Sequence, residues 1–114
     1  MNRPIIGHIN INFLEGKFEA LKHLVEDKLD VLVVTETKID ASYPTSQFAI
    51  KGFGTPFRQD RNKHGGGVLI YIREHLSCRQ IPFHNKPNDI EGIFVELCLR
   101  KKKWLIFGGY NPIS

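Results

Sequence analysis

The stretch Asp30-Val31-Leu32-Val33-Val34-Thr35-Glu36 holds four consecutive apolar residues without polar alternation. A short apolar run of this kind is typical of a β-strand that is buried on both faces. Two elements are expected before it: a β-branched strand at 4–11 and an amphipathic helix at 13–29. Strand, helix and buried strand in this order indicate a β-α-β unit, and with it an α/β fold in which helices cover a sheet.

The helix expected at 13–29 has both an apolar face and a start signal. Asn12 is a good N-cap, and Glu15 three residues later approximates a capping box. The apolar residues recur at helical spacing, at Leu14, Phe18, Leu21, Val25 and Leu29.

After Glu36 the chain breaks into shorter segments. The polar stretch 40–47 predicts a surface loop, and a glycine triplet at 65–67 predicts a tight turn. A basic hairpin turn is expected at 100–103. Strands are expected at 48–51, 55–58, 68–72, 93–99 and 104–107. The second half is therefore predicted to be a meander of antiparallel strands within one domain.

The composition is that of a globular protein. A chain of 114 residues with 41% hydrophobic and 25% charged residues allows one domain, and excludes a disordered tail or a disulfide-rich miniprotein. No apolar run approaches the roughly 18 residues of a membrane span, so no membrane partner is expected. Cys78 and Cys98 are not at metal-binding spacing. We interpret them as reduced thiols of an intracellular protein.

The net charge of +4 is unevenly distributed, because ten of the sixteen Lys and Arg residues lie in 58–114. A basic half of this kind fits a polyanion-binding protein, and equally an ordinary solvated surface. Arg58, Arg61 and Lys63 precede the glycine triplet. They are candidates for nonspecific contacts with a nucleic-acid backbone, the alternative being an exposed hairpin tip.

Polar residues follow the first two predicted strands. Asn10 and Asn12 lie at the end of the first strand, and Glu36 ends the second. If these strands are parallel neighbours, Asn10 and Glu36 face one crevice at the edge where ligands collect in open α/β sheets. A carboxylate and an amide oxygen form a partial shell that suits Mg²⁺. The alternatives are a solvated strand end for Glu36 and a helix cap for Asn12.

Four segments of the chain resemble the beginning of the endonuclease/exonuclease/phosphatase family, in particular the apurinic-endonuclease-like domains of non-LTR retrotransposons. They are Gly7-His8-Ile9-Asn10-Ile11-Asn12, Asp30 to Glu36 with the following Thr37-Lys38, Asp60-Arg61 ahead of Gly65-Gly66-Gly67-Val68-Leu69-Ile70-Tyr71, and Gly109-Tyr110-Asn111-Pro112. The resemblance covers essentially all 114 residues.

The resemblance implies an α/β (α+β) fold of a particular kind, a four-layer sandwich with two mixed β-sheets and flanking helices. It implies that 1–114 is the N-terminal portion of one such domain, truncated before its C-terminal half. The half-built sheets are then expected to expose strands, which favours association with the missing half or self-association.

The resemblance also implies a function, the nicking of nuclear DNA by an endonuclease that uses Mg²⁺ (or Mn²⁺). Glu36 matches the metal-ligand glutamate, and Asn10 matches the asparagine beside the metal and the scissile phosphate. Tyr110 matches the tyrosine that approaches the phosphate, and Asn111 in the same motif is assigned to nucleic-acid binding. Asn12 occupies a position that is an acid in some members.

The chain departs from the family in one respect that bears on catalysis. It has no Gly-Asp-x-Asn motif and no terminal Ser-Asp-His motif, which act on the water and the phosphate in the family. Loss of acid–base assistance costs about 10²–10⁴-fold in rate, so we expect the chain alone to be inactive. The alternatives are a non-catalytic nucleic-acid-binding remnant and a phosphatase of the same family.

Overall fold

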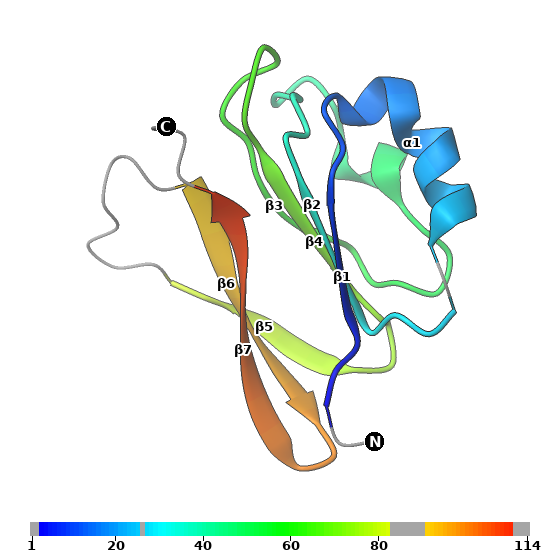
Figure 1. Cartoon of the computed structure of the whole chain (residues 1–114). Coiled ribbons are helices and arrows are strands. Elements are labelled where there is room, and N and C mark those ends of the chain that lie inside the picture. Colours follow the sequence, from blue (N-terminus) through cyan, green and yellow to red (C-terminus); the bar gives the residue numbers. More distant parts are fainter. Residues whose placement is uncertain (1–2, 26, 83–90, 111–114) are drawn as a thin grey trace.

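The computed structural model describes residues 3–25, 27–82 and 91–110, except for the side chains of Glu91 and Tyr110. These residues form an α+β fold of two β-sheets (Figure 1). The elements, in chain order, are β1 (Ile6–Asn10), α1 (Leu14–Leu24), β2 (Val31–Thr35), the 3₁₀ helix η1 (Thr45–Phe48), β3 (Phe57–Gln59), β4 (Val68–Ile72), β5 (Ser77–Ile81), β6 (Glu91–Leu99) and β7 (Lys102–Tyr110).

The first sheet has the strand order β1-β2-β4-β3 and is mixed. β1 and β2 are parallel neighbours, with Asn10 opposite Thr35, whereas β4 pairs antiparallel with both β2 and β3. Parallel strands need a crossover connection, and α1 provides it. The predicted β-α-β unit is therefore confirmed.

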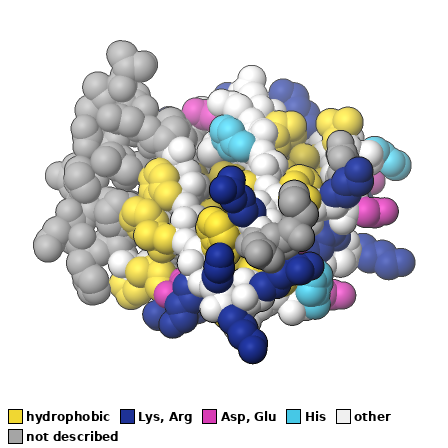
Figure 2. Space-filling model, turned by 60° about the horizontal axis from the view of Figure 1, so that its bottom comes forward, with side chains coloured by type: hydrophobic (Ala, Val, Ile, Leu, Met, Phe, Trp, Pro, Cys, Tyr) yellow, Lys and Arg dark blue, Asp and Glu magenta, His cyan; other side chains and the backbone are white. Residues whose placement is uncertain are grey.

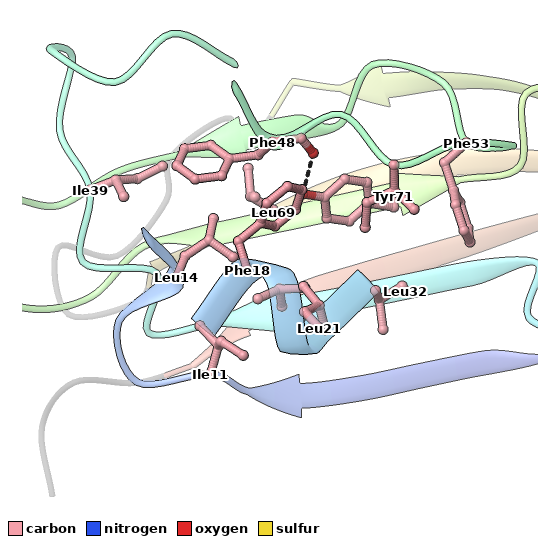
Figure 3. Close-up of a cluster of buried hydrophobic side chains, with 12 residues drawn as sticks. Ile11, Leu14, Phe18, Leu21, Leu32, Ile39, Phe48, Phe53, Leu69 and Tyr71 are labelled. Carbon is pink, nitrogen blue, oxygen red and sulfur yellow. Dashed lines mark hydrogen bonds between the residues drawn. The ribbon is translucent and has the colours of Figure 1, made fainter. Parts of the chain in front are cut away.

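The helix α1 and the loop containing η1 cover one face of the first sheet (Figures 1 and 3). Leu14, Phe18 and Leu21 of α1 are buried against side chains of β2 and β4. At the centre of this cluster, the hydroxyl of Tyr71 donates a hydrogen bond to the carbonyl oxygen of Phe48 at 2.8 Å (Figure 3). Burial raises the pKa of the Tyr71 hydroxyl well above its usual range, so it stays protonated and keeps this donor role.

The second sheet, β5-β6-β7, is antiparallel throughout and lies against the other face of the first sheet. The two sheets share an apolar core formed by Val31, Val33, Val68, Ile70, Ile72, Ile93, Val95, Leu97 and Ile106. Only one of the two sheets is thus mixed, and within the described residues no helix covers the outer face of the second sheet. The four-layer arrangement that the resemblance implies is not found in this part of the chain.

One expectation about local structure is wrong. The strand expected at 48–51 does not form: Phe48 is the last residue of the 3₁₀ helix η1 and is buried, and 49–51 pairs with no strand. The strand β5 contains Cys78, and its exposed residues Ser77, Arg79 and Gln80 leave it without a clear apolar pattern. Backbone pairing with β6 holds it in place.

The start of α1 also differs from the expectation. Asn12 is not the N-cap: Phe13 occupies that position with φ of 91°, and it makes no side-chain capping bond. Backbone carbonyls after β2 replace the cap, because the N–H groups of Phe13 and Leu14 donate to the carbonyl oxygens of Glu36 and Thr37 at 3.0 and 2.9 Å. The helix start is thereby fixed to the end of β2.

The two cysteines lie on opposite faces of the second sheet, since Cys78 pairs with Leu97 in register and Cys98 pairs with Ser77. Both are free thiols. Cys78 packs against the core between the sheets, and its partial burial raises the pKa of the thiol. This arrangement agrees with the interpretation of both residues as reduced.

Candidate functional site

Three loops meet at the edge of the first sheet where β1 and β2 end. They are the connection from β1 to α1, the segment 36–38 after β2, and the turn 60–67 between β3 and β4. Backbone hydrogen bonds join the second loop to the third, because the Lys38 N–H donates to the Gly66 carbonyl oxygen at 2.9 Å. The carbonyl groups of 36 and 37 join the same loop to the start of α1. The three loops therefore form one connected unit.

The backbone of this unit is unusually rich in left-handed conformations. Asn12, Phe13, Glu36 and Lys38 have φ values of 49°, 91°, 58° and 54°. Elsewhere in the described part of the chain, non-glycine residues with positive φ occur only in the β6–β7 hairpin turn. Such conformations are costly for residues with a Cβ, and they cluster at functional sites. This concentration marks the loop unit as the candidate functional site.

Glu36 is the carboxylate of this site. Its side chain is half-buried, and Oε2 accepts a hydrogen bond from the Gly66 backbone N–H at 3.2 Å. Gly66 has φ of 72°, a conformation that places its N–H toward the carboxylate at little steric cost for glycine. The Glu36 carboxylate is therefore held at the sheet edge by the glycine-rich turn.

Asn10 is the neighbouring polar residue on β1. It is exposed, and its register partner is Thr35, the residue directly before Glu36. The parallel pairing thus brings the ends of β1 and β2 together, as the sequence predicted. Asn10 and Glu36 belong to the same corner of the sheet.

Asn12 has a different partner from the one that a metal site would require. Its Oδ1 accepts a hydrogen bond from Lys38 Nζ at 2.5 Å, and its carbonyl oxygen accepts one from Lys17 Nζ at 2.9 Å. An ammonium group bound to the amide oxygen opposes a second cation there. Lys38 is a residue of the site that the sequence reasoning left without a role.

The side chains at this corner carry oxygen atoms of the kind that Mg²⁺ binds. Mg²⁺ is commonly held by one or two carboxylates and keeps several waters, and it prefers hard oxygen ligands such as those of Glu36 and Asn10. In residues 3–25, 27–82 and 91–110, no group of three or more His, Cys, Asp or Glu side chains is placed to hold a metal ion. A metal here would therefore depend on Glu36, amide oxygens and water.

Arg58 was expected to contact a nucleic-acid backbone, but its side chain is engaged within the protein. Its guanidinium is largely buried and donates to both carboxylate oxygens of Asp60 at 2.9 Å. It also donates to the backbone carbonyl oxygens of Tyr43 and Asp40 at 2.6 and 2.7 Å. These contacts tie the loop after β2 to β3. Arg58 is thus a structural residue and not a surface contact for phosphate.

Arg61 and Lys63 lie in the turn between β3 and β4, and both are exposed. The turn is closed by the backbone pairing of Asn62 with Gly65 at 3.3 Å, and Asn62 Oδ1 accepts from the His64 N–H at 2.8 Å. Arg61 folds back over Gly65, where an added Cβ would lie 2.3 Å from its Nη2. The turn therefore presents basic side chains beside the loop that holds Glu36.

Tyr110 is the third residue that the resemblance assigns to the site, and the structure describes only its backbone. Tyr110 ends β7 opposite Glu91, but its side chain is not among those the structure describes, and Asn111 lies outside the described residues. β7 and β1 run in the same direction along the two sheets (Figure 1). The backbone of Tyr110 therefore lies at the end of β7 that corresponds to the Asn10 end of β1.

Comparison with protein-family models gave no match, and comparison with curated proteins gave none either. Within the described residues, no helix combines the length and the hydropathy required to span a bilayer. Any assignment of function therefore rests on the residues and their arrangement.

Proposed function

We propose that this chain supplies the N-terminal, metal- and phosphate-binding part of a divalent-metal-dependent DNA endonuclease of the apurinic-endonuclease-like type. The observation that supports it best is the meeting of Glu36 and Asn10 at one corner of the sheet, within loops of left-handed backbone conformation. The resemblance of the same residues to the family's motifs points to the same chemistry.

In this proposal, Glu36 and Asn10 hold Mg²⁺ or Mn²⁺. A bound divalent ion supplies neutralisation of the charge that develops on phosphate oxygens during hydrolysis. The chain's own cations add to this: Lys38 at the loop unit, and Arg61 and Lys63 in the neighbouring turn, favour the approach of a DNA backbone. Tyr110 donates a hydrogen bond to the phosphate, as the resemblance implies.

Metal binding by the 114-residue chain is the first test. On adding Mn²⁺ to ¹⁵N-labelled protein, the amide signals of 10–12, 36–38 and 66–67 are expected to broaden before others. Glu36→Gln should weaken Mn²⁺ binding by at least about tenfold, because even residues that merely support a metal ligand contribute 10–100-fold. Glu96→Gln is the matched control, since that carboxylate pairs with Arg79 on the second sheet. Broadening that is the same in wild type and Glu36→Gln would contradict the proposal.

Catalysis is tested by plasmid nicking with Mg²⁺, for the chain and for a chain extended into the downstream reading frame. We expect nicking by the extended chain only, abolished by Glu36→Gln.

Lys and Arg side chains are spread over the end of the molecule that includes the β6–β7 turn (Figure 2), which favours a second candidate, a non-catalytic nucleic-acid-binding protein. Salt-dependent DNA binding without nicking, unchanged in Glu36→Gln, would support that candidate and contradict the first.

We further propose that the chain associates through the open edge formed by β1 and β7. Apolar clefts of about 290 and 260 Å³ lie on the two sides of β1. Most large hydrophobic side chains that are exposed in the described structure line these clefts or adjoin them: Ile5, Ile6, Leu24, Leu105 and Phe107. An exposed apolar strand edge is a template for pairing with another chain, which is either a second copy or the remainder of the domain.

Sedimentation measures this association. The wild-type chain is expected to form dimers or larger species as its concentration rises. The side chain of Leu105 is 63% exposed. Leu105→Lys should raise the concentration at which half of the chains are associated by about tenfold or more. Ser77→Lys on β5 is the control for the added charge, because Ser77 lies away from the β1–β7 edge. A monomer at all concentrations would contradict self-association, and only the pairing of this edge with the remainder of the domain would then stand.

A further inference from the structure

The turn between β6 and β7 is a second place in the described chain where residues with a Cβ adopt positive φ. Leu99 and Lys102 are register partners, so Arg100 and Lys101 alone connect the two strands. Their φ values are 52° and 68°. The favoured two-residue hairpin turn with positive φ at both central positions is most readily filled by Asn-Gly, Asp-Gly or Gly-Gly. Arginine and lysine here therefore cost conformational energy that asparagine and glycine would not.

The side chains of this turn form a dense positive patch at one end of the second sheet. The exposed cations are Arg100, Lys101, Lys102 and Lys103. Within the described residues, no carboxylate forms an ion pair with any of them. Adjacent like charges repel one another, and an anionic partner relieves this repulsion when it binds. The turn thus carries a backbone cost and an electrostatic cost, and neither stabilises the fold.

This patch lies at the far end of the molecule from the corner where Glu36 and Asn10 meet (Figure 1). β7 runs from the turn to Tyr110, whose backbone lies at the same end as Asn10. At about 3.4 Å per residue, a strand of nine residues separates its two ends by roughly 27 Å. A ligand of the turn therefore makes its contacts apart from the metal-binding residues.

The composition of the turn indicates which anionic partner it fits. Segments that lie on anionic membranes combine their cations with large apolar side chains that enter the lipid. Residues 100–103 contain no apolar side chain, and Trp104, which follows, packs against the core between the sheets. A run of cations without an apolar component matches the closely spaced phosphates of a nucleic-acid strand.

We propose that the β6–β7 turn, residues 100–103, is a second nucleic-acid-binding surface. It contacts the phosphate backbone without a metal ion, and it does not distinguish base sequence, because phosphate contacts carry none. This inference goes beyond the proposed function, because it uses neither Glu36 nor Mg²⁺ and holds for a chain without nuclease activity. In a nuclease, the two ends of the molecule would hold two separate segments of nucleic acid.

The sharpest test is a variant that improves the turn while it removes two of the charges. Arg100→Asn/Lys101→Gly introduces the favoured turn pair, so the protein should unfold at a higher urea concentration than the wild type. In EDTA and at low salt, it should bind a short single-stranded oligonucleotide about tenfold more weakly, because two phosphate contacts are lost. The slope of log K against log salt should fall by about 0.7 for each contact. Weaker binding by a more stable protein does not result from misfolding.

Lys102→Gln/Lys103→Gln is a second variant, which keeps the two central residues of the turn. It should weaken oligonucleotide binding to a similar extent. Lys22→Gln/Lys51→Gln is the matched control, since it removes the same net charge beside a cavity on the side of the first sheet that α1 covers. Because exposed charges far from the ligand are largely screened, this control should bind within about twofold of the wild type.

Two outcomes would overturn the proposal. Equal weakening in the control and in both turn variants would show that binding depends on net charge alone. Tighter binding of phosphatidylserine-containing vesicles than of the oligonucleotide would assign the turn to a membrane surface instead. Neither outcome bears on the Mn²⁺ titration of Glu36→Gln, so the inference and the proposed function fail separately.

Discussion

Gly67→Ala is expected to destabilise the protein by about 3 kcal/mol. Gly67 has φ of 101°, where a residue with a Cβ is strained by about 1–3 kcal/mol. The added methyl group would also lie 2.0 Å from Oγ1 of Thr37, a completely buried side chain, and overpacking of this kind costs about 1–3 kcal/mol. Urea denaturation measures the change in the free energy of unfolding.

Two further variants show whether backbone strain or the collision with Thr37 causes the loss of stability. In the double variant Gly67→Ala/Thr37→Ala, the collision with the hydroxyl is gone but the backbone strain persists, so part of the loss should be recovered. Gly54→Ala is the matched control, because its Cβ would meet only the Ile72 carbonyl oxygen at an ordinary 3.7 Å. A free energy of unfolding within about 0.5 kcal/mol of wild type for Gly67→Ala would show that the turn is not constrained as described.

Gly67→Ala should also weaken metal binding at Glu36. The residue before it, Gly66, donates its N–H to the Glu36 carboxylate, and Thr37 follows Glu36 directly. A shift of the glycine turn away from Thr37 therefore moves the group that holds the carboxylate. The Mn²⁺ titration described above measures this effect, provided that the variant is still folded.

Arg58→Met is expected to cost about 3 kcal/mol of stability. The guanidinium side chain is 14% exposed, and Asp60 beside it is 21% exposed. Removing one partner of a largely buried ion pair leaves the other charge without compensation, which costs about 3–5 kcal/mol. Partial exposure of Asp60 reduces the cost toward the lower value. The carbonyl oxygen of Tyr43 loses the Arg58 donor as well, whereas the Asp40 carbonyl oxygen keeps its bond from the Tyr43 N–H.

Arg79→Met is the matched control for Arg58→Met. Arg79 also pairs with a carboxylate, that of Glu96 at 3.2 Å, but its side chain is 66% exposed. Exposed pairs contribute about 0–1 kcal/mol, so this variant should unfold near the wild-type midpoint. Equal losses for the two variants, measured by urea denaturation, would refute a structural role that depends on burial.

The β-α-β unit was predictable from the sequence because its signals are local. The apolar run of β2 and the helical stripe of α1 each fix an element through the spacing of neighbouring residues. The position of Glu36 at the end of β2, and its nearness to Asn10, followed from the parallel pairing that such a unit requires. This part of the candidate site was thus accessible before the structure.

The start of α1 and the role of Arg58 were not predictable in this way. Asn12 has the chemistry of an N-cap, but distant carbonyl groups after β2 satisfy the helix, and Lys38 occupies the Asn12 side chain. Arg58 has the chemistry of a phosphate contact, but Asp60 and the loop after β2 surround its guanidinium. In both cases a partner distant in sequence, or the folding of a loop, overrides the local preference.

The sequence by itself determined the elements that carry a local apolar pattern, namely the uninterrupted run of β2 and the helical stripe of α1, and the order in which Asn10, Glu36 and Tyr110 occur along the chain. The tertiary structure decided which polar groups satisfy one another: Glu36 with Gly66, Asn12 with Lys38, and His8 with Thr35. The physical reason is the separation along the chain over which each kind of signal acts. Periodicity acts between neighbours in the chain, whereas a hydrogen bond depends on distances that exist only once the strands have paired.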